Sequence, residues 1–118
     1  MILTYRDLDV WKNAMDLVEK VYAYTKNFPS EERYSLTSQI RRCAVSIPSN
    51  IAEGFMRKNT REYIQFLYIA LGSLGELDTQ LELSIRIGFI KEEQDLKENI
   101  TTIRKQLYGL VKVLREKL

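Results

Sequence analysis

The sequence predicts an all-α fold: one antiparallel, up-down-up-down four-helix bundle that comprises residues 1–118. Three observations support this prediction. Four segments repeat apolar residues at the helical spacing of three and four, no segment alternates apolar and polar residues as a half-buried strand does, and the connections are short. Short connections place consecutive helices side by side and antiparallel, so the four segments are expected to form a bundle. A chain of 118 residues has the length of a single ordinary domain.

The first predicted helix begins after Asp7, a residue type that favours the N-cap position, and ends before residues 27–30, which contain a proline. The second predicted helix begins near Ser35 and continues to Gly54. Pro48 lies inside the periodic pattern of this second helix, where a proline removes one backbone hydrogen bond. We therefore expect the second helix to be kinked at Pro48.

The third predicted helix begins at about Thr60, and the fourth covers the periodic pattern of residues 96–118. Gly72 and Gly75 lie inside the third helix, where each glycine costs about 1 kcal/mol relative to alanine. Two explanations are open. Either these glycines face the small residues that flank the proline of the second helix, inside the bundle, or they admit a neighbouring subunit.

Charge is segregated along the chain, although the net charge is only +2. Residues 33–61 carry six basic side chains against one acidic, and residues 99–118 carry five against one, whereas residues 1–32 and 62–98 have an acidic excess. Alternation of sign around a bundle would let neighbouring helices attract one another, at about 0.2–1 kcal/mol per exposed pair. The alternative is a basic surface that contacts phosphate groups and whose binding weakens steeply with salt.

The candidate nucleic-acid-binding residues belong to the two basic segments: Arg57, Lys58, Arg61, Arg104, Lys105, Lys112, Arg115 and Lys117. The first three lie close together beside the predicted start of the third helix, whose free backbone N–H groups add positive potential. In an up-down bundle, this connection lies at the same end as the C-terminus of the fourth helix. We therefore predict a basic end that suits phosphate contacts rather than the reading of base edges.

A polar stripe is predicted on the second helix, where four residues share one face beside the apolar seam: Arg42, Ser46, Asn50 and Glu53. Glu76 lies on the third helix, opposite this stripe. We expect Arg42, Asn50, Glu53 and Glu76 to form a structural polar network, in which Arg42 pairs with Glu76 or Glu53 and sets the register of the helices. A ligand-binding pocket is the alternative interpretation.

The composition argues against an enzyme. The chain has no histidine, and Cys43 is its single cysteine, which excludes a structural zinc site, an intramolecular disulfide and a Ser-His-Asp triad. Glu53 and Glu76 are the only carboxylates expected to turn inward, and two carboxylates make a poor transition-metal site. Cys43 occupies a seam position and is expected to pack as a small apolar residue. We predict a non-enzymatic protein with no metal, no cofactor and no small-molecule substrate.

The sequence also argues against a membrane protein. No apolar run approaches the roughly 20 residues that span a bilayer, and the first residues lack the features of a signal peptide. We expect a cytoplasmic protein that does not contact the membrane.

Three segments carry a family resemblance: Tyr5–Ala14 (YRDLDVWKNA), Leu36–Gly54 (LTSQIRRCAVSIPSNIAEG) and Phe66–Leu81 (FLYIALGSLGELDTQL). They resemble the four helix bundle proteins that are encoded in 23S rRNA intervening sequences. The predicted fourth helix matches this family in pattern only, and Cys43 stands where alanine is common.

The resemblance implies a bacterial homo-oligomer, commonly a pentameric ring. The same superfamily includes the accessory variability determinant proteins of diversity-generating retroelements, which are basic pentamers that bind nucleic acid and a reverse transcriptase. We therefore expect a homopentameric accessory protein that binds RNA or DNA. A protein-interaction scaffold without a nucleic-acid role is the alternative, and a small-molecule-binding or catalytic bundle would depend on the polar stripe alone.

Overall fold

The computed structural model describes residues 1–118 and contains four α-helices and no strand. The helices are α1 (Asp9–Thr25), α2 (Leu36–Phe55), α3 (Thr60–Arg86) and α4 (Gln94–Arg115). Two short 3-10 helices precede α1 and α2, namely η1 (Tyr5–Asp7) and η2 (Ser30–Glu32). The predicted all-α class is confirmed, and the four helices pack together as a bundle.

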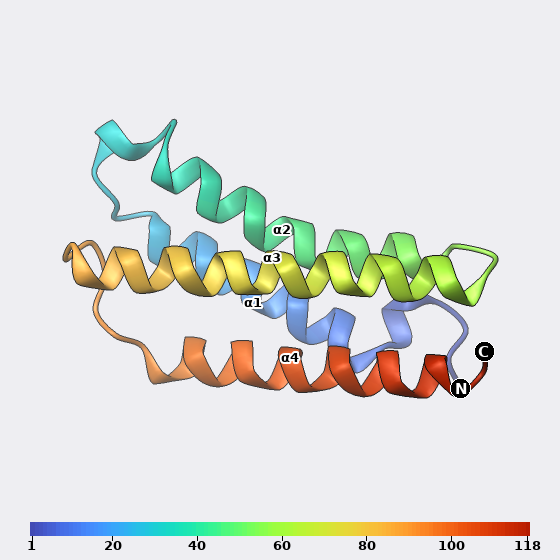
Figure 1. Ribbon diagram of the computed structural model, residues 1–118. Coiled ribbons are helices and arrows are strands. Elements are labelled where there is room, and N and C mark those ends of the chain that lie inside the picture. Colours follow the sequence, from blue (N-terminus) through green and yellow to red (C-terminus); the bar gives the residue numbers. More distant parts are fainter.

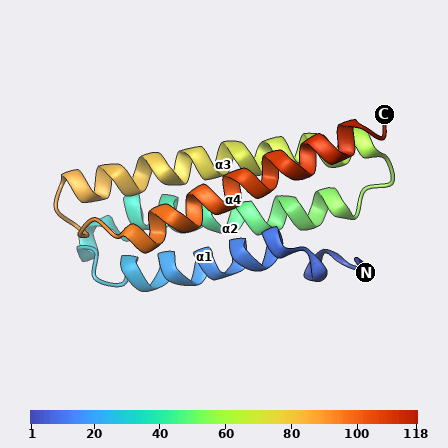
Figure 2. The same cartoon turned by 90° about the horizontal axis from the view of Figure 1, so that it is seen from below.

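The bundle is elongated, with principal extents of 46 × 26 × 21 Å. Each helix contacts the next one along the chain, and α4 also contacts α1, so the four helices close into a ring. Figure 1 shows both chain termini and the α2–α3 connection at one end of the molecule, which we call the terminal end. The α1–α2 and α3–α4 connections lie at the opposite end, as the rotated view of Figure 2 also shows.

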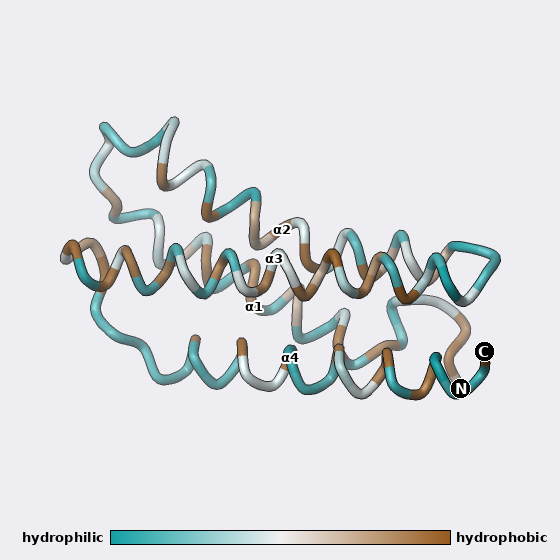
Figure 3. The backbone as a smooth tube through the Cα atoms, in the orientation of Figure 1, coloured by the Kyte–Doolittle hydropathy of each residue, from teal (hydrophilic) through white to brown (hydrophobic).

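The four helices enclose one apolar core of 22 buried residues. Along each helix these residues recur at spacings of three and four, so apolar bands alternate with polar ones in Figure 3. On α3, the core positions Leu67, Ala70, Leu74 and Leu77 are between 0% and 1% exposed. Burial of this stripe explains why α3 is a helix of 27 residues even though it contains two glycines.

The α2 helix is continuous through Pro48, which is itself buried. In Figure 1 the first half of α2 diverges from α3, whereas the second half lies alongside it. The kink expected at Pro48 stays a prediction.

Two predicted helix starts are correct in position and one is wrong. Asn59 caps α3, because its Oδ1 atom accepts a hydrogen bond from the backbone N–H of Glu62 at 2.8 Å. Ser35 occupies the N-cap of α2 but makes no capping hydrogen bond with its side chain. Asp7 does not cap α1. Its carboxylate instead accepts hydrogen bonds from the backbone N–H groups of Leu3 and Thr4, which closes a capping box around η1.

The glycines of α3 do not face another helix inside the bundle. Gly72 and Gly75 are exposed, and a Cβ atom added to either would meet no atom within 4 Å. Ala44, one of the small residues that flank Pro48, is fully buried in the core and so cannot lie opposite them on the surface. The explanation in which these small residues pack against each other is wrong.

The close approach between helices occurs at Gly54, near the end of α2. A Cβ atom here would lie 2.7 Å from Cβ of Phe66 and 3.2 Å from the backbone oxygen of Tyr63. Glycine is therefore required where α2 meets the first turns of α3, next to the terminal end.

Candidate functional site

The α2–α3 connection places three of the candidate cations at the terminal end. One of them is ion-paired and the other two are not. Arg57 donates a hydrogen bond from Nη2 to Oε2 of Glu53 at 3.0 Å, and its guanidinium lies 4.7 Å from the centre of the Phe66 ring. Lys58 and Arg61 are exposed and form no ion pair. The two free cations of this connection are therefore Lys58 and Arg61.

The C-terminal helix supplies the second group of candidate cations. Arg104 pairs with Asp78 of α3 at 3.5 Å. Lys105, Lys112 and Lys117 are exposed and form no ion pair. These lysines lie on the second half of α4 and on the residues that follow it, which run toward the terminal end in Figure 1.

Arg115 contacts an aromatic ring rather than a carboxylate. Its Nη2 donates a hydrogen bond to the hydroxyl of Tyr68, and its guanidinium lies 5.4 Å from the centre of that ring. The structure thus brings the end of α4 against the beginning of α3 and leaves the positive charge of Arg115 unpaired.

Ion pairs between helices neutralise few of the basic side chains. Only two ion pairs join different helices, Arg104 with Asp78 and Lys20 with Asp95. In the second pair the cation lies on α1 and the carboxylate on α4, opposite to the expected attraction between an acidic first helix and a basic fourth one. Attraction between neighbouring helices therefore accounts for one candidate cation, Arg104.

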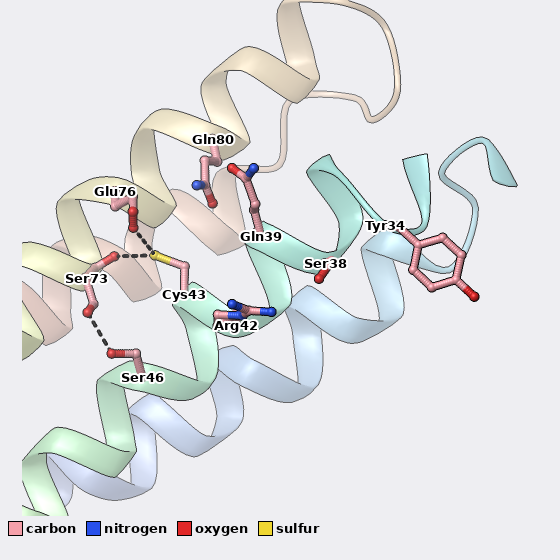
Figure 4. A pocket seen from close by; sticks show the side chains of 9 residues that line it. All are labelled: Tyr34, Ser38, Gln39, Arg42, Cys43, Ser46, Ser73, Glu76 and Gln80. Carbon is pink, nitrogen blue, oxygen red and sulfur yellow. Dashed lines mark hydrogen bonds between the residues drawn. The ribbon is translucent and has the colours of Figure 1, made fainter. Parts of the chain in front are cut away.

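A polar cavity of about 510 Å³ separates the first half of α2 from α3. Figure 4 shows the nine side chains that line it: Tyr34, Ser38, Gln39, Arg42, Cys43, Ser46, Ser73, Glu76 and Gln80. Two hydroxyl groups, of Ser46 and Ser73, lie 2.8 Å apart across the helix interface. The thiol of Cys43 lies 3.0 Å from the backbone oxygen of Ser73 and 3.4 Å from Oε1 of Glu76.

The predicted network of Arg42, Asn50, Glu53 and Glu76 does not form. Arg42 is exposed and pairs with neither carboxylate. Glu53 binds Arg57 one turn further along α2, and Oε1 of Glu76 lies 3.4 Å from the thiol of Cys43. Asn50 instead donates hydrogen bonds to the backbone oxygen of Ser46 at 2.8 Å and to its hydroxyl at 2.9 Å. The polar contacts between α2 and α3 are made by Cys43 and Ser46 of α2 with Ser73 and Glu76 of α3.

Ser46 belongs to the predicted stripe, whereas Ser73 and Cys43 were missed as members of this network. Their signal in the sequence is weak, because a serine or cysteine beside an apolar seam is compatible with exposure, burial or a bond to its own helix. The Arg57–Glu53 pair had a clearer signal, since the two residues are four apart on α2.

Cys43 is not poised for nucleophilic chemistry. Burial, together with the hydrogen bond to the Glu76 carboxylate, raises the pKa of its thiol to about 12. At neutral pH the group is the protonated thiol, whereas the nucleophile is the thiolate. Cys43 packs at the seam, 6% exposed, as expected for a small apolar residue.

No group of three or more His, Cys, Asp or Glu side chains comes together in an arrangement that could hold a metal ion. None of the helices is both long enough and apolar enough to span a bilayer.

Comparisons with known proteins place these observations in context. A family model described as 23S rRNA-intervening sequence protein matches residues 6–109. Among solved structures, the fold is similar to that of a protein of unknown function from the S23 ribosomal protein family of Bacteroides thetaiotaomicron. The two chains are 27% identical with a TM-score of 0.79, and the match covers 87% of this chain and 95% of the other. No curated protein matches this chain.

Proposed function

Because this chain belongs to the family of 23S rRNA-intervening sequence proteins, we propose that it is a non-enzymatic, homo-oligomeric accessory protein that binds nucleic acid at its terminal end. One observation carries this proposal: the segments that meet at this end carry five exposed cations without an ion-pair partner, namely Lys58, Arg61, Lys112, Arg115 and Lys117. Unpaired cations on one face supply the sequence-independent contacts to phosphate.

The backbone at the terminal end supports the same proposal. The N-terminus of α3 lies here, and the free N–H groups of a helix N-terminus favour anions. Two exposed carboxylates, of Glu62 and Glu116, lie in the same segments and reduce the positive potential. A single copy thus presents a moderate charge, and a ring of copies would repeat it around one rim.

The proposed oligomer is a pentamer that assembles through the exposed face of α3. Gly72 and Gly75 leave a flat surface there, with open space beyond each. Ile69 and Leu83, on the same outer face, are 46% and 47% exposed. Flat surface next to exposed apolar side chains suits close contact with a second copy of the chain.

Light scattering tests the assembly. We expect a mass near five times the 13.9 kDa of the chain at micromolar concentration. Replacing Gly72 and Gly75 together by Gln should reduce the mass to that of one chain, while the higher helix propensity of glutamine preserves the fold. A monomeric wild-type protein would refute the oligomer, and an unchanged assembly of the double variant would move the contact to another face.

The nucleic-acid interface is tested by the anisotropy of a labelled RNA oligonucleotide at two salt concentrations. The triple variant Lys58→Ala, Arg61→Ala, Lys112→Ala should bind RNA at least about tenfold more weakly and with a smaller salt dependence. The matched control is Lys26→Ala, Arg33→Ala, Lys91→Ala, which removes the same charges from the connections at the opposite end. Equal affinities of the two triple variants would contradict the proposed location, and no binding by the wild-type oligomer at low salt would remove the nucleic-acid role.

A further inference from the structure

A surface groove of about 370 Å³ lies between α3 and α4 near the terminal end. It is lined by Tyr68, Tyr108, Val111, Lys112, Arg115 and Glu116. The groove combines two aromatic rings with two cations, a combination that neither the apolar core nor the polar cavity between α2 and α3 contains.

Tyr108 presents an aromatic ring to solvent without a structural reason for it. The residue is 56% exposed, lies outside the apolar core and makes no ring contact with another aromatic or cationic side chain. Exposed Lys105 precedes it by three residues and exposed Lys112 follows it by four, so all three share one face of α4. The free ring therefore stands between two free cations.

Tyr68 and Arg115 form the opposite wall of the groove. The Tyr68 ring is partly buried against the core, and its hydroxyl accepts the hydrogen bond from Arg115. This bond orients the guanidinium without neutralising it. The Glu116 carboxylate also lines the groove and disfavours a phosphate beside it, so a bound strand would place its phosphates toward Lys112 and Lys105.

An exposed aromatic ring flanked by cations is the pattern of a surface that binds unpaired nucleotides, because bases stack on the ring while the cations contact the backbone. In a duplex the faces of the bases are already covered by their neighbours and are not available to a side chain. We infer that the terminal end prefers single-stranded nucleic acid over a duplex, and that Tyr108 stacks on a base. This inference rests on the proposed function and specifies its ligand.

The test compares a single-stranded RNA of about 20 nucleotides with the duplex of the same sequence, in low salt, by anisotropy. We expect the oligomer to bind the single strand at least about tenfold more tightly than the duplex. Tyr108→Ala should weaken single-strand binding by about 5- to 150-fold, since each stacked base contributes about 1–3 kcal/mol, and should leave duplex binding unchanged. Tyr108→Phe should bind as the wild type does, because stacking requires the ring and not the hydroxyl.

Tyr34→Ala is the matched control, since Tyr34 is 89% exposed and precedes α2 at the opposite end of the bundle. It should not change affinity for either probe. Equal affinity for both probes, or a Tyr108→Ala variant that loses nothing on the single strand, would overturn the inference while the basic interface remains. Absence of binding to both probes would instead reject the nucleic-acid role itself.

Discussion

Gly54 shows how a single residue sets the distance between two helices. Its missing side chain lets α2 approach Phe66 and Tyr63 of α3, and any Cβ atom would meet both. The backbone oxygen of Tyr63 is part of a helix and cannot move aside as a flexible side chain can. Helix propensity and packing therefore favour different residues at this position, and packing prevails.

Gly54→Ala should lower the free energy of unfolding by up to about 2 kcal/mol, because overpacking costs about 1–3 kcal/mol and helix propensity returns only about 1 kcal/mol. Gly109→Ala is the control, since a Cβ atom at this exposed position of α4 meets nothing within 4 Å. That control should stabilise the protein by up to about 1 kcal/mol. Chemical denaturation measures both values, and a stabilising Gly54→Ala would show that α2 and α3 can separate at no cost.

Cys43 should make the free energy of unfolding fall as the pH rises into the alkaline range. The folded pKa of about 12 lies above the ordinary thiol value of 9.0, so the folded chain holds this proton more tightly than the unfolded chain. The stabilisation is complete below pH 9 and is lost as the pH rises toward 12. Between pH 8 and pH 10, the free energy of unfolding should fall by about 1 kcal/mol from this group.

Cys43→Ser removes the titrating group and retains a hydrogen-bonding side chain. The variant should therefore lose about 1 kcal/mol less than the wild type over the same pH interval. Burial raises the pKa of Tyr63 to about 12 as well. Its unfolded pKa of 10.0 lies at the upper end of this interval, and its contribution is the same in the variant and in the wild type, so it cancels in the comparison. Parallel pH profiles for the variant and the wild type would show that the thiol environment does not affect stability.

The ends of the helices, rather than their interiors, distinguish the elements from one another. All four helices share the same apolar periodicity, but only α3 has an N-cap side chain that bonds a backbone N–H group. This cap lies between Lys58 and Arg61, at the connection where the candidate interface begins. The cap thus orders the segment that carries the two free cations of this connection.

Asn59→Ala should destabilise the protein by about 1 kcal/mol, because it leaves the N–H group of Glu62 without its partner. Asn59→Ser should recover most of this loss, since serine also caps well. Ser35→Ala, at the N-cap of α2 where the side chain makes no capping bond, should change stability much less. Urea titrations give the free energies of unfolding of the three variants. Equal losses for Asn59→Ala and Ser35→Ala would contradict the role of the cap.

The whole bundle is held together by its apolar core rather than by its charges. Twenty-two buried apolar residues form one cluster, whereas only two ion pairs join different helices, and their side chains are between 34% and 59% exposed. Exposed pairs contribute about 0–1 kcal/mol each. Salt should therefore affect the fold and the proposed interface very differently.

Raising the NaCl concentration from about 50 mM to about 500 mM should change the melting temperature by only a few degrees, because screening removes little from the fold. Over the same range, binding of RNA should weaken more than about tenfold. Circular dichroism and anisotropy on the same samples provide the comparison. A large fall in melting temperature with salt would mean that ion pairs, and not the core, hold the helices together.

The sequence by itself determined the number of helices, the seams that the second, third and fourth helices bury, and the segments that carry basic charge. The starts of α2 and α3 were predicted at Ser35 and Thr60, because helix formation depends on local spacing and on residues next to each other along the chain. The match of residues 6–109 to the family model agrees with the resemblance read from Tyr5–Ala14 and the two longer segments.

Only the tertiary structure decided which charges are free and which small residues are packed. Gly72 and Gly75 face solvent while Gly54 is buried against α3, and Arg104 is paired while Lys105 beside it is not. These differences depend on how each helix is rotated against its neighbours and on which side chain stands opposite. A periodic pattern specifies one buried face for each helix, but it does not specify the partner that each position outside that face will meet.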